Sequence, residues 1–175
     1  MNIIEIKKAS LSDLDLLRTI SINTFIETFS DVNSVENMDN YVRDNFNTEQ
    51  LTSELLNPDS HFYLATIENE TLGYLKLNFG KAQTEIINEQ AMEIHRIYVL
   101  QEFHGKKLGP LFMEQALLIA NQKNVDYIWL GVWEENHRAL NFYKKNGFVE
   151  FDSHVFTLGD DQQTDLLMKL QIKKQ

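Results

Sequence analysis

Alternating apolar and polar positions over residues 3–9, IIEIKKA, predict a β-strand near the start of the chain. A helix is expected next, because apolar residues recur at roughly helical spacing and Ser10 or Ser12 can serve as its N-cap. The apolar positions of this helix are Leu14, Leu17, Phe25 and Phe29. Ser34 and Thr48 are expected to cap two more short helices.

The middle of the chain has the pattern of a β-hairpin followed by another strand and a helix. HFYLATIE (61–68) and LGYLKLNF (72–79) follow the turn NPDS and flank the polar turn NET, which predicts the hairpin. A strand is expected over Ala91–Val99, and the helix after it carries one apolar stripe. The stripe consists of Leu108, Leu111, Phe112, Ala116, Ile119 and Ala120.

The pattern in the last third of the chain predicts a strand at VDYIWLGVW (125–133) and a helix over residues 137–146. Gly147 suits the position just past a helix end, and two closing strands are expected around GDDQQT (159–164). In order, these elements indicate a mixed α+β fold rather than a continuous βαβ repeat. With only two prolines and seven glycines the chain shows no linker, so we expect a single domain over residues 1–175.

Composition narrows the classes of partner. Sixteen basic and 26 acidic residues leave a net charge of −10, which disfavours nonspecific binding to nucleic acid or anionic membrane and favours small cationic partners. The absence of cysteine excludes disulfides, thiolate metal sites and a cysteine nucleophile. His61, His137 and His154 are too dispersed to indicate zinc, so we expect no metal. Without a signal-peptide pattern or a membrane-length apolar run, a soluble cytoplasmic protein is expected.

The loop HGKKLG (104–109) stands between a strand and a helix that has Pro110 in its first turn. Unpaired N–H groups and the helix dipole at such a point can hold a phosphate, although a plain strand-to-helix turn has the same pattern. The loop matches neither the Walker spacing nor G-x-G-x-x-G. The residues alone leave both interpretations open.

The segment NHRALNFYKKNGF (136–148) fits N-x-x-A-x-x-F-Y-x-K-x-G-F and follows RIYV (96–99) and the HGKKLG loop. Together these motifs resemble the GCN5-related N-acetyltransferase (GNAT) family. FNTEQL, IWLGVWE, FYKKNGF and GDDQQTDLLM further resemble the PaiA-type spermidine/spermine acetyltransferases of that family. The resemblance covers nearly the whole chain. It implies a mostly antiparallel central sheet, splayed between two central strands and flanked by helices.

The resemblance implies acetyl-CoA as cosubstrate, bound between the splayed strands. The backbone of Ile97, Tyr98 and Val99 would pair with the pantetheine arm. Pyrophosphate would lie on the segment His104, Gly105, Lys106, Lys107, Leu108, Gly109 and Pro110. Three of these depart from the usual pattern: His104 replaces Gln or Arg, Lys107 replaces a glycine, and Pro110 has no N–H to donate. We therefore expect weaker cosubstrate binding than is typical of the family.

Three residues of the 136–148 segment would act on the cosubstrate by the same resemblance. Tyr143, with a phenol pKa near ~10, would protonate the departing thiolate; the alternative is an aromatic residue of the core. Asn136 would hydrogen-bond the cosubstrate, and it also suits a helix N-cap. Lys145 would lie near the 3′-phosphate of the adenosine, or it is simply solvated.

An ammonium group has no lone pair, so the acceptor amine must lose a proton before it attacks a thioester. Period-2 geometry places Glu93, His95, Ile97 and Val99 on one face of their strand, which makes Glu93 and His95 the nearest titratable groups. His95 stands where family members often have a glutamate, and it could accept the proton near neutrality; Glu93 could act through water. A structural histidine is the alternative for His95.

For a polycationic acceptor, carboxylates should line the amine side of the cleft, and Glu27, Asp31, Glu36 and Asp39 are the candidates. Each of them alone suits a surface charge equally well. Trp129 and Trp133 are expected to pack beside the cosubstrate rather than to form a cation–π cage.

The leading hypothesis is an N-acetyltransferase that moves acetyl from acetyl-CoA to a primary amine, most simply a polyamine such as spermidine or spermine. Direct attack in a ternary complex is favoured because no cysteine is available for an acetyl-enzyme. A protein N-terminus or lysine as acceptor is one alternative, and a non-catalytic acetyl-CoA or polyamine sensor is another. Nucleic acid and membrane partners are not expected, whereas a homodimer is compatible with the fold.

Overall fold

The computed structural model describes residues 3–68, 70–85 and 88–173. Asn69 of the expected NET turn lies outside the described residues. The strands are β1(Glu5–Lys8), β2(Ser60–Ile67), β3(Glu70–Asn78), β4(Ala91–Val99), β5(Tyr127–Trp133), β6(Val149–Leu158) and β7(Asp161–Gln171). The α-helices are α1(Leu14–Phe29), α2(Val35–Asn45), α3(Thr48–Leu56), α4(Leu108–Gln122) and α5(His137–Lys145). Short 3-10 turns occur at η1(Leu11–Asp13), η2(Gly80–Ala82) and η3(Gln101–Phe103).

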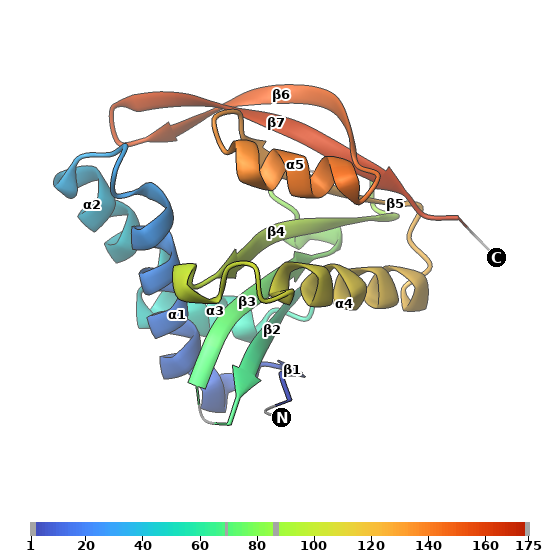
Figure 1. Ribbon diagram of the computed structural model, residues 1–175, viewed down its shortest axis with the longest axis horizontal. Coiled ribbons are helices and arrows are strands. Elements are labelled where there is room, and N and C mark those ends of the chain that lie inside the picture. Colours follow the sequence, from blue (N-terminus) through green and yellow to red (C-terminus); the bar gives the residue numbers. More distant parts are fainter. Residues whose placement is uncertain (1–2, 69, 86–87, 174–175) are drawn as a thin grey trace.

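The described strands form one mixed sheet in the order β1-β2-β3-β4-β5-β7-β6 (Figure 1). Neighbouring strands are antiparallel except β4 and β5, which are parallel. These two central strands pair only from Ala91 opposite Tyr127 to Glu93 opposite Trp129. Beyond this point they diverge and leave backbone groups of β4 free for another partner. The expected α+β architecture with splayed central strands is confirmed.

Both faces of the sheet are covered, and the side chains of β2 show why. Phe62 and Leu64 pack in one apolar cluster with Leu17 of α1, whereas Tyr63 and Ala65 pack on the opposite face in the cluster that contains α4. Successive residues of a strand point to opposite faces, so a strand buried on both faces is apolar without alternation. The expected stripe of α4 is partly confirmed: Leu108, Phe112, Ala116 and Ala120 are buried, together with Met113.

Several predicted element ends can be checked directly. Ser34 caps α2, as expected, by accepting from the Asn37 N–H at 3.2 Å. The prediction for Thr48 was wrong by one residue, because Asn47 caps α3 by accepting from the Gln50 N–H at 2.8 Å. The closing turn is also shorter than expected: β7 already begins at Asp161.

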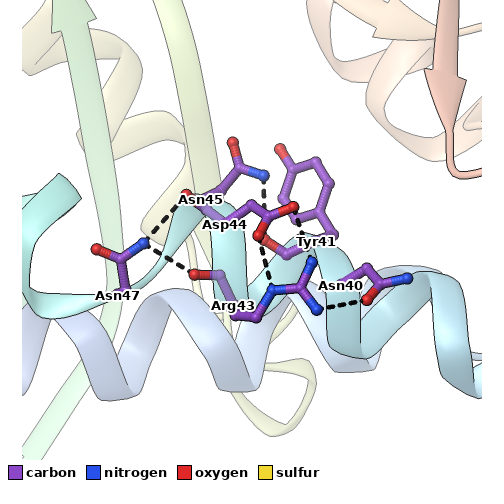
Figure 2. Close-up of polar contacts among 6 residues, drawn as sticks. All are labelled: Asn40, Tyr41, Arg43, Asp44, Asn45 and Asn47. Atoms are coloured by element: carbon purple, nitrogen blue, oxygen red, sulfur yellow. Dashed lines mark hydrogen bonds and ion pairs between the residues drawn. The ribbon is translucent and has the colours of Figure 1, made fainter.

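The corner between α2 and α3 is fixed by side chains that bond to helix carbonyls (Figure 2). Asn47 donates to the carbonyls of Arg43 and Asp44 at 2.8 and 3.2 Å, and Asn45 donates to the carbonyl of Tyr41 at 3.0 Å. The bonds from Asn47 satisfy carbonyls of Arg43 and Asp44 that the helix end leaves without partners. Together with the bond from Asn45, they hold the turn of α2 that carries Tyr41.

The tip of the β6–β7 hairpin reaches across the molecule to α2 (Figure 1). Asn37 donates to the carbonyl of Leu158 at 3.2 Å and to the carboxylate of Asp160 at 3.0 Å. Gly159 has φ +64°, and a Cβ at this position would overlap the Asn37 side chain. The helices near the start of the chain and the hairpin near its end therefore meet above the splayed strands.

Candidate active site

Two cavities meet where β4 and β5 diverge. The hairpin-side cavity, about 370 Å³, lies among α1, α2, the central strands and the β6–β7 hairpin. The loop-side cavity, about 440 Å³, lies among the end of β4, the start of α4 and α5. Ile97, Tyr98, Asn136, Ala139 and Tyr143 border both cavities. A group that enters from one side can therefore meet a group that enters from the other beside Tyr143.

The loop before α4 borders the loop-side cavity with the geometry of an anion site. Gly105 has φ +80°, and Lys107, the N-cap of α4, adopts the left-handed conformation with φ +64°. That conformation is strained for a residue with a side chain. The N–H groups of Leu108 and Gly109 lie in the first helical turn, where a helix offers them no partner. Pro110 is the third residue of the helix, where it removes one potential donor.

Two residues expected near the cosubstrate, Lys106 and Lys145, do not border the loop-side cavity. The ammonium of Lys106 lies 4.4 Å from the ring centre of Phe103 and does not border the loop-side cavity. Lys145 is exposed in the last turn of α5, away from both cavities. Glu27, expected on the acceptor side, instead borders the loop-side cavity and accepts from the Gln101 N–H at 2.8 Å. Its carboxylate anchors the turn η3.

Asn136 and Tyr143 hold the junction of the two cavities. Asn136 caps α5 by accepting from the Ala139 N–H at 3.1 Å. Tyr143 is 5% exposed and packs between the rings of Phe142 and Phe148. Burial raises the pKa of the Tyr143 phenol well above its usual range. The side chain is thus both part of the core and a protonated phenol at a cavity wall.

Glu93 is held in the wall of the hairpin-side cavity by three donors. It accepts from the Thr84 N–H at 2.9 Å, from the Thr84 hydroxyl at 2.6 Å and from the Asn78 amide at 3.1 Å. Burial is the largest influence and raises the pKa of Glu93, while the bonds from Thr84 and Asn78 oppose it. The carboxylate is 2% exposed and oriented by its partners.

His95 borders the same cavity and lies at a β-bulge in β4. Lys76 of β3 opposes Arg96, but its neighbour Leu77 opposes Ile94, so His95 is the extra residue. The strict alternation expected from Glu93 to Val99 was therefore wrong, and both His95 and Arg96 reach the cavity wall. Burial, followed by the charges of Arg96 and Lys76, holds the pKa of His95 well below its usual range. His95 is neutral near pH 7.

A buried ion cluster of Glu54, Lys76 and Arg96 connects α3, β3 and β4. The Lys76 ammonium lies 2.9 Å from the Glu54 carboxylate, and the Arg96 guanidinium lies 3.7 Å from the same oxygen. Arg96 also lies over the ring of Phe46, 5.0 Å from its centre. Burial lowers the pKa of Lys76 to about 8, with the Arg96 charge acting in the same direction. The cluster fixes two cations beside the hairpin-side cavity.

The carboxylates expected from the sequence are not the ones that line the hairpin-side cavity. Asp31, Glu36 and Asp39 are exposed and lie outside it. Besides Glu93, the cavity wall contains Glu85 and Asp165, which sequence analysis missed. Asp165 faces the cavity by strand alternation in the hairpin, since His154 and Phe156 on β6 and Gln163 and Asp165 on β7 are spaced by two, whereas Glu85 comes from the loop after η2.

His154 lies between these carboxylates. Its Nδ1 contacts Glu85, and its Nε2 lies 3.8 Å from Asp165. Burial raises the pKa of Asp165, and the His154 charge opposes that shift. Aromatic side chains complete the wall: Phe25, Phe29, Tyr41, Phe46, Trp129, Trp133 and Phe156. Trp129 donates to the Gln83 side chain at 2.7 Å, which fixes its ring.

The sequence was also compared with known families. A profile of the "Acetyltransferase (GNAT) family" matches residues 22–148, which include both central strands, the loop before α4 and α5. The chain belongs to this family. The resemblance found in the sequence motifs is thereby confirmed.

Comparison with individual relatives shows which GNAT proteins this chain resembles. It is 39% identical over 166 residues to an uncharacterised N-acetyltransferase of Lactobacillus delbrueckii subsp. lactis, covering 95% of this chain and 96% of the relative. It is 29% identical over 153 residues to the spermidine N(1)-acetyltransferase of Thermoplasma acidophilum, covering 86% and 91%. The crystal structure of the PaiA N-acetyltransferase of Thermoplasma acidophilum in complex with coenzyme A matches with a TM-score of 0.80 at 26% identity. That match covers 97% of this chain and 99% of the other, and it supports the likeness to PaiA-type enzymes.

As a GNAT acetyltransferase the protein uses acetyl-CoA as cosubstrate, and the loop-side cavity fits such a molecule chemically. The unpaired backbone of β4 beyond Glu93 can bond an extended amide chain, and the first turn of α4 presents N–H groups suited to phosphate. When bound, the thioester supplies an activated acetyl group. Tyr143 stands at the wall where the two cavities meet.

Proposed function

We propose that this acetyltransferase transfers the acetyl group of acetyl-CoA to a primary amine of a polyamine such as spermidine or spermine, by direct attack in a ternary complex. The observation that carries the proposal is the junction of the two cavities at Tyr143, which lets the amine and the thioester approach from opposite sides. The carboxylates Glu85, Glu93 and Asp165 and the aromatic walls suit a long cation with methylene segments. The likeness to a spermidine N(1)-acetyltransferase supports the same acceptor.

The proposed chemistry follows from the charge states of the wall. Glu93, whose pKa is raised by burial, takes the amine proton through a water molecule, whereas the lowered pKa of His95 makes it the weaker proton acceptor of the two. The amine nitrogen forms a bond to the thioester carbonyl carbon, and the carbon–sulfur bond then breaks. Tyr143 donates its proton to the departing sulfur, since a phenol is protonated at neutral pH.

On the cosubstrate side we propose that the backbone of Ile97, Tyr98 and Val99 and the N–H groups of Gly105 and 107–109 hold acetyl-CoA, since the N–H groups of His104 and Lys106 already donate to the carbonyls of Gln101 and Phe103. Asn136 contributes by fixing the start of α5 and by bordering both cavities.

We also propose that residues 1–175 form a single domain and that the protein is cytoplasmic. No helix in the described part of the chain is long and apolar enough to cross a membrane.

The experiment that tests the acceptor is a steady-state assay of CoA release from acetyl-CoA. Spermidine, spermine, a lysine peptide and a peptide with a free N-terminus are offered in parallel. Turnover with the polyamines alone is the expected result. Asp165→Asn should raise the KM for spermidine, whereas the control Asp152→Asn, on an exposed position of the same hairpin, should not. Turnover with peptides alone would overturn the polyamine proposal.

A peptide N-terminus or lysine is the second candidate acceptor, and one observation favours it. Arg96 borders the hairpin-side cavity, and its buried Nη1 atom, 3.7 Å from the Glu54 carboxylate, makes no hydrogen bond among the described residues. A guanidinium in that position can donate to a peptide carbonyl. The third hypothesis is a sensor that has no catalytic activity. It would be supported if the protein binds acetyl-CoA but shows no turnover with any acceptor.

A further inference from the structure

A contact between His104 and Arg138 spans the loop-side cavity. His104 lies between η3 and α4, whereas Arg138 is the second residue of α5, and both border this cavity. The Nε2 atom of His104 lies 2.8 Å from the carbonyl oxygen of Val99, and its Nδ1 atom contacts a guanidinium nitrogen of Arg138. The two bonds connect the β4 wall to the α5 wall.

The partners of His104 fix its tautomer. A carbonyl oxygen only accepts, so Nε2 must carry the hydrogen that it donates to Val99. The guanidinium only donates, so Nδ1 must be the accepting nitrogen. His104 is therefore a neutral acceptor for Arg138, and a neutral acceptor binds a guanidinium less strongly than a phosphate oxygen does. Arg138 is held loosely and remains available for a stronger partner.

The geometry points to an exchange of partners: we propose that Arg138 binds the pyrophosphate of acetyl-CoA and that His104 holds this arginine in place until the cosubstrate arrives. Phosphate and guanidinium match in a two-bond geometry, and both side chains are exposed enough to move. The arginine also offsets a deficit in the loop itself, where Pro110 lacks the N–H that the first turn of a helix usually offers.

The test is direct binding of CoA and of dephospho-CoA, which keeps the pyrophosphate and lacks the 3′-phosphate, measured by titration calorimetry on the full chain. Arg138→Ala should weaken the binding of both ligands by about tenfold, since it removes one charge-assisted contact. Lys144→Ala is the matched control, because it removes a cation from an exposed position of the same helix that does not border the cavity. It should change either affinity by less than about twofold. No acceptor is needed, so failure of the polyamine proposal leaves this result unaffected.

His104→Ala tests the holding role. Loss of the competing acceptor should tighten CoA binding by about two- to fivefold, because Arg138 no longer has to be released. Weakening comparable to that of Arg138→Ala would show that His104 itself binds the cosubstrate and would overturn the exchange. An Arg138→Ala effect on CoA but not on dephospho-CoA would assign the arginine to the 3′-phosphate and refute the pyrophosphate contact. Unchanged affinity for both ligands would remove Arg138 from the site altogether.

Discussion

Thr84 donates both its backbone N–H and its hydroxyl to the carboxylate of Glu93, at 2.9 and 2.6 Å. A residue from the loop after η2 thus sets the orientation and the charge of a buried carboxylate in the wall of the hairpin-side cavity. Because the Thr84 bonds lower the pKa of Glu93 against the larger effect of burial, they favour its ionised form.

Thr84→Val should therefore raise the pKa of Glu93 further. If Glu93 acts as the ionised base, the acidic limb of the pH profile of kcat/KM moves to higher pH, and the free energy of unfolding falls by about 2 kcal/mol. A pH–rate profile and urea denaturation measure the two effects. The control is Thr71→Val, because the buried Thr71 hydroxyl has no hydrogen-bond partner among the described residues. An unshifted acidic limb in Thr84→Val would remove Glu93 from proton transfer.

Tyr143→Phe should lower kcat by roughly 10²- to 10³-fold while leaving the Kd for CoA nearly unchanged, because only the proton donor is lost. The ring stays in place, so packing against Phe142 and Phe148 is preserved. Tyr127→Phe, at a position of β5 that borders neither cavity, is the control. Full activity of Tyr143→Phe would assign the phenol to the core alone.

Stability should depend on pH through His95. Its folded pKa lies well below its ordinary value, so below about pH 6.5 the unfolded chain binds a proton that the native state refuses. The contribution of His95 is fully present above that pH and is lost as the pH falls, at up to about 1.4 kcal/mol per pH unit. Urea denaturation at pH 5 and pH 7 measures it. His95→Gln should reduce the difference in unfolding free energy between pH 5 and pH 7. His137→Gln, at an exposed position, is the control and should leave that difference unchanged.

Glu54→Gln should destabilise the protein by about 3 kcal/mol, since it leaves Lys76 and Arg96 as buried cations without a counter-charge. Glu49→Gln, in an exposed position of the same helix, should change the unfolding free energy by less than about 0.5 kcal/mol. Chemical denaturation compares the two. Equal stability of both variants would mean that Glu54 is not ionised in the folded protein.

Gly159→Ala should lower the free energy of unfolding by about 1–2 kcal/mol because of the left-handed conformation at this position. Overlap of the new Cβ with Asn37 should lower it further. Because the hairpin tip bounds the hairpin-side cavity, the KM for the amine should rise more than the KM for acetyl-CoA. The double variant Asn37→Ala with Gly159→Ala removes the overlap and should recover part of the stability, which thermal denaturation can show. A rise confined to the KM for acetyl-CoA would contradict the separate roles of the two cavities.

The sequence predicted this fold well because its signals are local. The strand Ala91–Val99, the N-cap Ser34 and the terminating Gly147, which has φ +88°, follow from patterns within a few residues. The side chains that line the hairpin-side cavity could not be predicted in the same way. Asp165 reaches it only through the pairing of β7 with β5, and Glu85 through a loop between strands. The bulge at His95 depends on the register with β3, which no pattern within β4 reveals.

The two cavities draw most of their walls from separate stretches of the chain. The loop-side cavity is built chiefly from residues 97–110 and 136–143, whereas α1, α2 and the hairpin contribute residues 25–46 and 154–165 to its neighbour. Under the proposed roles of the two cavities, acetyl delivery and amine choice depend largely on different segments, although Glu27 and Thr28 of α1 also border the loop-side cavity. Substitutions in the hairpin segment should accordingly change the accepted amine more than they change the binding of acetyl-CoA.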